Sequence, residues 1–160
     1  MIQRIQSVFL LVAAILAVVC LSLPVASLEM GTTTLPLGGT VAKEALVYNL
    51  WITADGAKEL TTWPLFLLLA CSAAMAIYTI FGYRNRIMQA RFCMFTSMLL
   101  VGWHILAAVY SQILVDGQTR MAFHNEPASI LPLFSLILTI MARRAILKDE
   151  KLVRAADRIR

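Results

Sequence analysis

The residue types that could do chemistry are few in this chain, and one histidine lies inside a long apolar stretch. His104 is in the middle of Phe92 to Val115, a stretch without Asp, Glu, Lys or Arg. In a helix it lies about 18 Å from Phe92, because each residue rises 1.5 Å. An ionisable residue at such a depth in a membrane is a functional candidate, whereas a neutral histidine bonded to a neighbouring helix is the alternative. We therefore predict a candidate intramembrane polar site at His104.

The three cysteines are spaced in a way that argues against thiol chemistry. Cys20, Cys71 and Cys93 form no Cys-x-x-Cys pair, in which one thiol resolves the other. A zinc site made by Cys20, Cys71 and His104 has no support from their spacing. We expect buried cysteines that pack as small apolar residues. We predict no catalytic residue, no cofactor and no metal site, so the chain is not expected to be an enzyme.

Cationic residues gather between and after the apolar stretches. They set membrane orientation, attract anionic lipid at about 1 kcal/mol per basic residue, or bind a cytoplasmic protein. The interspersed Asp149, Glu150 and Asp157 would not help a segment that only binds lipid, so we favour the protein partner. The candidate contacts with a partner or with lipid are Arg84, Arg86, Arg91, Arg143, Arg144, Lys148, Lys151, Arg154 and Arg158.

The composition indicates that the chain lies in a membrane. Of its 160 residues, 60% are hydrophobic and only 14% are charged, against about 25% charged in a typical soluble domain. The net charge of +5 does not indicate nucleic-acid binding, because the charges lie at the ends of apolar runs and not on one basic face. Membrane lipids are therefore expected partners, and nucleic acid is not.

The apolar runs predict an all-α integral membrane protein, a bundle of four transmembrane helices in a single membrane domain, residues 1–160. A span needs about 20 residues. The fourth run is short, and we expect Arg143 and Arg144 to snorkel to the lipid headgroups. The predicted spans are residues 7–28, 62–83, 92–115 and 127–146. The predicted connections are outer loops at 29–61 and 116–126, an inner loop at 84–91 and a cytoplasmic helical tail at 147–160.

The first apolar run also has features of a secretory signal peptide. It follows Arg4, and Val25-Ala26-Ser27 is similar to a small-residue cleavage site. The uncharged run from Ile5 to Leu28 is long for the apolar part of a signal peptide. We therefore predict that the first helix is retained as a span.

The cationic residues are distributed unevenly over the two sides of this topology. With the N-terminus inside, eleven Lys and Arg residues lie inside, and only Lys43, Lys58 and Arg120 lie outside. Cytoplasmic loops of membrane proteins carry such an excess. Both termini are therefore predicted to be cytoplasmic.

The first outer loop differs in composition from the spans. It holds Thr32-Thr33-Thr34 and then Gly38-Gly39, and residues 46–53, rich in β-branched and aromatic types, precede the turn signal Ala54-Asp55-Gly56. Such a pattern favours two short strands, which we expect as a β-hairpin on the outer face. Trp63-Pro64 then begins the second span, because proline suits the first helical turn.

Small residues recur at four-residue spacing inside the runs. Ala13 and Ala17 form one such pair, and Ala107 and Ser111 form another. Small residues allow helix backbones to approach closely in a membrane. The contact is either internal to one bundle or made with a partner helix, so a homo-oligomer is one alternative.

Three segments of the chain resemble a known family. They are the opening Met1 to Ser7, the turn Tyr83 to Arg86 with Gln89 and Arg91, and the tail Arg144 to Arg160. In these segments the chain resembles the bacterial family known as domain of unknown function 4293. The resemblance covers the whole chain and implies a small four-span protein of the bacterial inner (cytoplasmic) membrane, with no assigned activity.

Together, these observations predict a role that does not involve catalysis. We predict an uncharacterised integral inner-membrane protein that acts as an interaction or accessory subunit of a membrane complex. Its contact surface would be the basic turn and the tail, and its partner another membrane or cytoplasmic protein. The alternative is a small oligomeric transporter or channel centred on His104.

Overall fold

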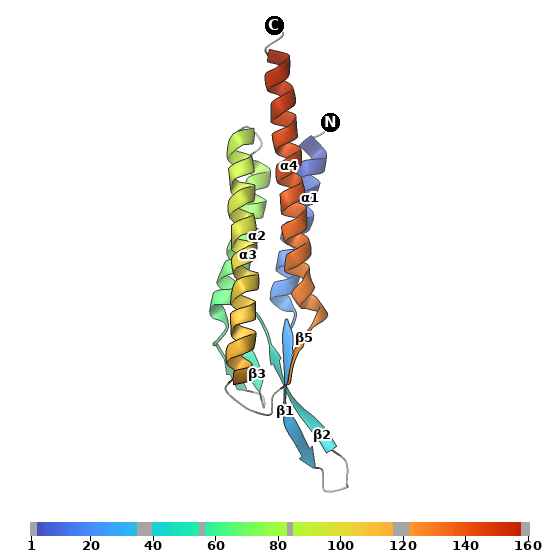
Figure 1. The fold of residues 1–160 in the computed structure, drawn as a ribbon, viewed down its shortest axis with the longest axis vertical. Coiled ribbons are helices and arrows are strands. Elements are labelled where there is room, and N and C mark those ends of the chain that lie inside the picture. Colours follow the sequence, from blue (N-terminus) through green and yellow to red (C-terminus); the bar gives the residue numbers. More distant parts are fainter. Residues whose placement is uncertain (1–2, 35–39, 55–56, 83–84, 117–121, 158–160) are drawn as a thin grey trace.

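The computed structural model describes residues 3–34, 40–54, 57–82, 85–116 and 122–157. Both ends of the described chain lie at one end of a helix bundle, the tail end, and a β-sheet lies at the other, the sheet end (Figure 1). Within the described residues the helices are α1 (Gln3–Ser22), α2 (Trp63–Phe81), α3 (Arg86–Asp116) and α4 (Leu131–Asp157), with a 3₁₀ turn, η1 (Pro127–Ile130), before α4.

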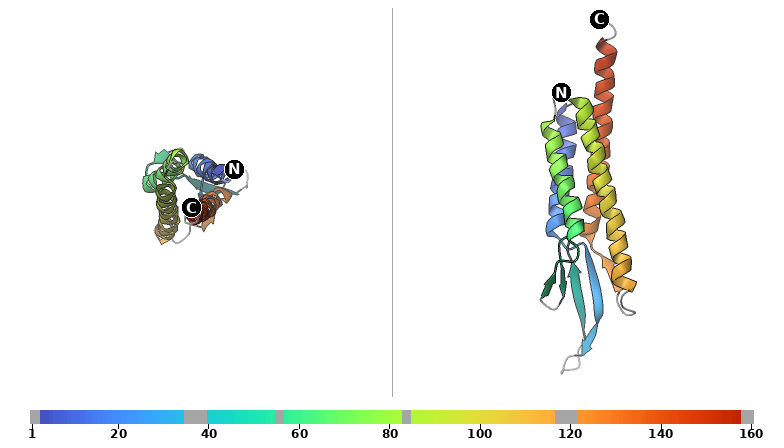
Figure 2. Two further views of the ribbon diagram at one scale, coloured as in Figure 1. Left: turned by 90° about the horizontal axis from the view of Figure 1, so that it is seen from above. Right: turned by 90° about the vertical axis from the view of Figure 1, so that its left-hand side faces the viewer.

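The bundle is apolar on its outside as well as its inside. α1 packs against α2 and α4, and α3 packs against the same two helices, as the view along the bundle shows (Figure 2). Large aliphatic side chains stay exposed, among them Leu11 at 50%, Leu67 at 50% and Ile105 at 61%. Among the described residues, four helices are long and apolar enough to cross a membrane. The finding suggests a multi-pass membrane protein.

The first helix ends earlier than the sequence predicts. The expected end near residue 28 is corrected to Ser22, and Ala26 already begins a strand. Pro24 explains the difference, because proline has no N–H and disfavours a helical conformation at the residue before it. The N–H of Val25 donates to Val47 O at 2.8 Å. The chain therefore passes from the helix into the sheet within a few residues.

The third helix begins inside the predicted inner loop at 84–91. α3 starts at Arg86, so Arg86 and Arg91 belong to a helix and not to a loop. Residues 86–91 include Met, Gln, Ala and Arg, which favour helix. Gln89 Nε2 also donates to Thr79 O of α2 at 3.2 Å and thereby holds the start of α3 against α2.

The fourth helix joins the predicted fourth span and the predicted tail. α4 is continuous from Leu131 to Asp157, and it extends past the start of α1 (Figure 1). Residues 147–157 are helical, as predicted, because they are rich in Leu, Lys, Glu, Arg and Ala. As far as Asp157, the predicted tail is thus a continuation of the helix that contains the fourth span.

The loops at the sheet end form more than the predicted hairpin. β5 comes from the second loop and pairs antiparallel with β1, so the two loops share one sheet. The all-α class is therefore corrected to a helix bundle with a small antiparallel sheet. Among the described residues the strands are β1 (Ala26–Thr34), β2 (Thr40–Val47), β3 (Ile52–Ala54), β4 (Ala57–Glu59) and β5 (Ala122–Asn125), in the order β4-β3-β2-β1-β5.

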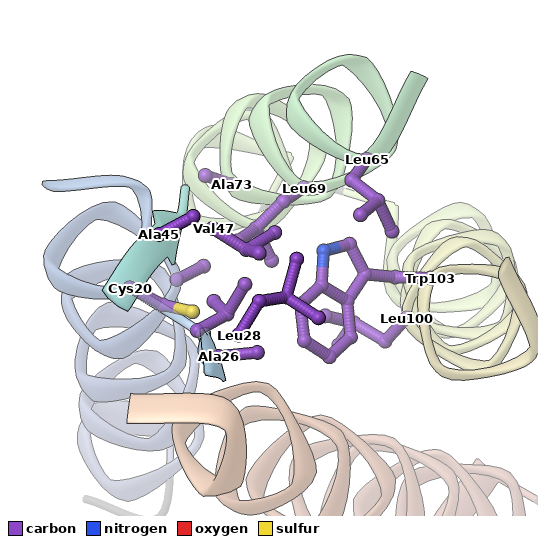
Figure 3. Close-up of a cluster of buried hydrophobic side chains, with 12 residues drawn as sticks. Cys20, Ala26, Leu28, Ala45, Val47, Leu65, Leu69, Ala73, Leu100 and Trp103 are labelled. Atoms are coloured by element: carbon purple, nitrogen blue, oxygen red, sulfur yellow. The ribbon is translucent and has the colours of Figure 1, made fainter. Parts of the chain in front are cut away.

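The larger apolar core lies where the sheet meets the bundle. Trp103 extends from α3 towards Leu28 of β1 and Val47 of β2 (Figure 3), and all three are buried. Leu65 and Leu69 of α2 belong to the same cluster. A second buried cluster lies at the tail end and contains Leu10, Ala90, Cys93, Ala142 and Ile146. The bundle is thus packed separately towards each end.

Candidate functional site

Asn49 ties the sheet to the bundle. It is fully buried, in the segment between β2 and β3. Its Nδ2 donates to Cys20 O of α1 at 2.8 Å, and its Oδ1 accepts a hydrogen bond from Trp103 Nε1 of α3 at 2.9 Å. Its backbone carbonyl accepts from the N–H of Phe66 of α2 at 3.1 Å. One residue therefore joins α1, α2 and α3.

These contacts explain why the predicted strand over residues 46–53 is interrupted. β2 ends at Val47 and β3 begins at Ile52. Between them Tyr48 O accepts a hydrogen bond from the buried Thr62 hydroxyl at 2.8 Å. A buried amide without partners would cost free energy, so the chain leaves the ladder where Asn49 can reach its partners.

A cavity of about 570 Å³ lies beside Asn49, between α3, the sheet and η1. We call it the junction cavity, and its volume falls within the range of about 300–1,000 Å³ that is usual for small-molecule sites. The sheet side is formed by Val25, Ala26, Val47 and Phe123, and Glu126 and Ser129 also line it. The α3 side is formed by Trp103, His104, Ala107, Tyr110, Ser111 and Leu114.

His104 lines this cavity and has its hydrogen-bond partner on its own helix. Its Nδ1 lies 2.8 Å from Leu100 O, and because a carbonyl oxygen only accepts, Nδ1 carries the hydrogen. The ring contacts Trp103 edge-on, with centroids 5.1 Å apart. The expected bond to a neighbouring helix is therefore corrected to a bond within α3.

The cysteines lie apart from one another. Cys20 and Cys93 are buried and Cys71 is exposed, and all three are free thiols. The expectation of buried cysteines is thus wrong for Cys71. Cys20 Sγ donates to Ala128 O at 3.4 Å, which adds η1 to the contacts around Asn49. In the described part of the chain, no group of three or more His, Cys, Asp or Glu side chains is placed to hold a metal ion.

A second buried polar contact joins the first and last helices at the tail end. Gln6 Nε2 of α1 donates to Asp149 Oδ2 of α4, and both side chains are buried. Asp149, which the sequence assigns to the tail from residue 147 onward, therefore packs against the start of α1. Residues after Asp149 continue for about 12 Å at 1.5 Å per residue.

These last residues of α4 and the first turn of α3 form a shallow groove. We call it the tail groove; its volume is about 510 Å³. Along α4, Ala142, Ile146 and Asp149 face the bundle and are buried, and Val153 follows at the same spacing but is 43% exposed. The bundle-facing side of α4 therefore continues into the groove. The groove is lined by Asn85, Arg86, Ile87, Met88, Glu150 and Val153.

Among the described residues, the predicted cationic contacts are distributed over α3 and α4. Arg86 lines the tail groove. Arg143 is half-buried, and its Nε has no hydrogen-bond partner among the described residues. Four of the others are exposed along α3 and α4, namely Arg91, Arg144, Lys148 and Lys151. Outside the described residues lie Arg84, Arg158 and the side chain of Arg154.

Sequence reasoning did not identify Asn49, Trp103 or the burial of Asp149. Asn49 is a polar residue within an apolar, β-branched run, which is a signal for a buried amide with partners. Trp103 carries an indole N–H that needs an acceptor when buried. Asp149 follows Ile146 and Ala142 at helical spacing, which places it on an apolar face.

Comparison with known proteins gives one family. The model of the family described as Domain of unknown function (DUF4293) matches residues 2–159, nearly the whole chain. No curated protein matches the chain.

Proposed function

Since this chain belongs to the family described as Domain of unknown function (DUF4293), we propose its role from its surfaces: it is a non-catalytic accessory subunit that binds a partner protein at the tail end. In this proposal the membrane is the bacterial inner membrane and the tail end faces the cytoplasm. The contact surface is the tail groove together with the exposed cations beside it.

The observation that carries the proposal is the apolar surface at the end of α4. Leu152 is 56% exposed and Val153 is 43% exposed. They follow four consecutive charged residues, Lys148 to Lys151, which are too costly to place in hydrocarbon. Leu152 and Val153 therefore lie in water, where adjoining apolar side chains favour a protein contact.

The opposite wall of the groove extends this surface. Ile87 is 44% exposed and Met88 is 42% exposed on the first turn of α3, and both line the groove with Val153. An apolar side chain of a partner would fill the space between them. Such a central apolar contact with a polar rim is typical of protein interfaces.

The charges favour a protein over a lipid surface. Lys148 and Lys151 are exposed and would attract either anionic lipid or carboxylates of a partner. Glu150 lines the groove beside Arg86, and an acidic residue there opposes the approach of anionic headgroups. A protein that presents both an apolar residue and carboxylates fits the mixed surface better.

The test uses two substitutions that add the same charge to the same helix. Val153→Asp places a carboxylate in the groove. Ala155→Asp is the control, because Ala155 is exposed and two residues correspond to a rotation of about 200° around a helix. The chain is tagged by an insertion in the segment between α3 and β5 and extracted from native membranes in mild detergent.

We expect one stoichiometric partner protein with the unmodified chain and with Ala155→Asp. Val153→Asp should reduce its recovery about tenfold or more, as expected for the loss of an interface hot spot. Recovery of the chain alone, with lipid only, or as a homo-oligomer would overturn the proposal. Equal recovery with both variants would remove the tail groove as the contact surface.

The alternative function, a small oligomeric transporter or channel centred on His104, draws on the position of His104 in the junction cavity. We rank it lower because the described lining on α3 ends at Trp103. About 26 Å of α3, from Arg86 to Trp103, lies beyond that end of the cavity. A polar path through the bundle would have to pass this length.

A further inference from the structure

The junction cavity exists because small side chains line it where large ones would fill it. Ala107, Ala108 and Ser111 form the middle of its α3 wall. Trp103 is kept to one side by its hydrogen bond to Asn49. Ala107 and Ser111, which the sequence predicts as a helix-packing pair, therefore border this cavity.

The cavity has the length and walls that suit a hydrocarbon chain. It follows α3 from Trp103 to Leu114, about 17 Å at 1.5 Å per residue. Val47 and Leu65 add aliphatic wall. It lies where the apolar bundle meets the sheet, the depth at which a lipid-like molecule changes from its tail to its head.

The polar groups of the cavity are mostly acceptors. The hydroxyls of Tyr110, Ser111 and Ser129 donate to backbone carbonyls at 3.1, 2.7 and 2.7 Å. His104 uses its Nδ1–H in the same way, and in the neutral tautomer with that hydrogen its Nε2 is an acceptor. Each of these groups can therefore receive a hydrogen bond from a ligand more readily than it can give one.

The charge of the cavity has one sign. Glu126 lines it, and among the described residues that line it there is no Lys or Arg. An anionic head group would meet a carboxylate with no compensating cation. An ammonium would pair with Glu126 and donate hydrogen bonds to neighbouring acceptors. Such charge-assisted hydrogen bonds are stronger than those between neutral groups.

We propose that the junction cavity binds an amphiphile with a hydrocarbon tail and a protonated amine as its head, the ammonium at Glu126 and the tail along Trp103, Leu65 and Leu114. This site lies at the opposite end of the bundle from the tail groove, so it goes beyond the accessory role. Either proposal can fail without the other.

Trp103 provides a reporter for the test. The chain has three Trp residues, so Trp51→Phe with Trp63→Phe leaves Trp103 as the single indole, at the cavity wall. The full chain is held in neutral detergent micelles at pH 7. Three probes are titrated that share one brominated alkyl chain: an alkylamine, an alkanol and an alkyl sulfate. The measured quantity is the quenching of Trp103 fluorescence by bromine.

We expect the alkylamine to quench saturably at one molecule per chain, with an affinity at least about tenfold above that of the alkyl sulfate. Glu126→Gln should lower the affinity for the alkylamine to the affinity for the alkanol. Glu59→Gln is the matched control, because Glu59 is exposed on β4 and does not line the cavity. It should leave the preference unchanged.

A second variant tests whether the probes bind in the cavity. Ala107→Phe should fill the cavity and remove the saturable quenching by every probe, while the thermal unfolding of the protein shows that it still folds. The proposal is overturned if quenching rises linearly with probe and never saturates. It is also overturned if amine and sulfate bind equally, or if Glu59→Gln acts like Glu126→Gln.

Discussion

The contacts that join the helices differ between the two ends of the bundle. At the sheet end, Asn49 bonds to α1, α2 and α3, and β5 brings the second loop onto β1. At the tail end, Gln6 and Asp149 join α1 to α4, and α4 then continues past the start of α1 (Figure 1), with the first turn of α3 across the tail groove. The sheet end is thus a junction of several elements beside a partly open cavity, and the tail end is a shallow open surface.

This difference separates the two proposed roles. A cavity needs walls that do not move relative to one another, and several elements fixed to one buried amide provide them. A docking surface needs an uncovered face, and a helix that extends beyond its neighbours provides that. The comparison predicts that stability depends mainly on the sheet end, while association depends on the tail end.

The largest effect on stability is expected at Asn49. Asn49→Ala leaves the indole N–H of Trp103 and the carbonyl of Cys20 without partners in a buried place, which should lower the free energy of unfolding by about 3–5 kcal/mol. Thermal unfolding can be followed with a thiol-reactive dye in a Cys71→Ser background, because Cys20 and Cys93 are buried. Asn85→Ala, at an exposed position of the tail end, should unfold like the unmodified chain.

A smaller loss is expected at the tail end. Asp149→Ala removes the acceptor of Gln6 and should cost about 1–3 kcal/mol, the usual penalty for an unpaired buried polar group. The same dye measurement applies, with Lys151→Ala as the exposed control. If Asp149→Ala lowered the unfolding temperature as much as Asn49→Ala, the proposed difference between the two ends would be wrong.

His104 should contribute little to the free energy of unfolding. His104→Phe keeps an aromatic ring beside Trp103 and removes only a bond to its own helix, so the cost should stay below about 1 kcal/mol. The accessory proposal expects unchanged recovery of the partner protein. Loss of the partner together with normal unfolding would instead favour a role centred on His104.

The smallest effect on stability is expected from the substitution with the largest expected effect on association. Val153→Asp changes a partly exposed residue beyond the packed bundle and should alter the free energy of unfolding by no more than about 0.5 kcal/mol. Thermal unfolding of the purified chain alone tests this. A clearly lower unfolding temperature would mean that the tail groove belongs to the folded core and is not a free surface.

The helices could be predicted from the sequence because their signals are local. Length and hydropathy identify the apolar helices, and propensity extends α4 to Asp157. The same signals misplace the end of α1, because an apolar run such as Val25 to Leu28 fits a buried strand as well as a helix. Only Pro24 indicated where the helix stops.

The sheet end could not be predicted because it depends on pairing between distant segments. β5 is short, and only its register with β1, with Ala26 opposite Asn125, gives it a place. The junction cavity needs α3, the sheet and Glu126 in position at once. Nothing in the local sequence around Ala107 distinguishes a cavity wall from a helix contact.

The tail end was predicted in part. The charge pattern identified the basic residues and the helical tail, and Arg86 lines the groove. Which face of α4 is left uncovered depends on where α1 begins relative to α4. That offset is a property of the packed structure, in which Gln6 contacts Asp149 and Ser135 Oγ donates to Ala13 O.

The most direct test of the account is a photo-crosslinking amino acid placed at Val153 in one variant and at Ala155 in another, activated in native membranes. We predict one adduct with a different protein from position 153, at defined mass, and none from position 155. An adduct from both positions with equal yield would contradict the account. So would adducts with lipid only, or with a second copy of the chain.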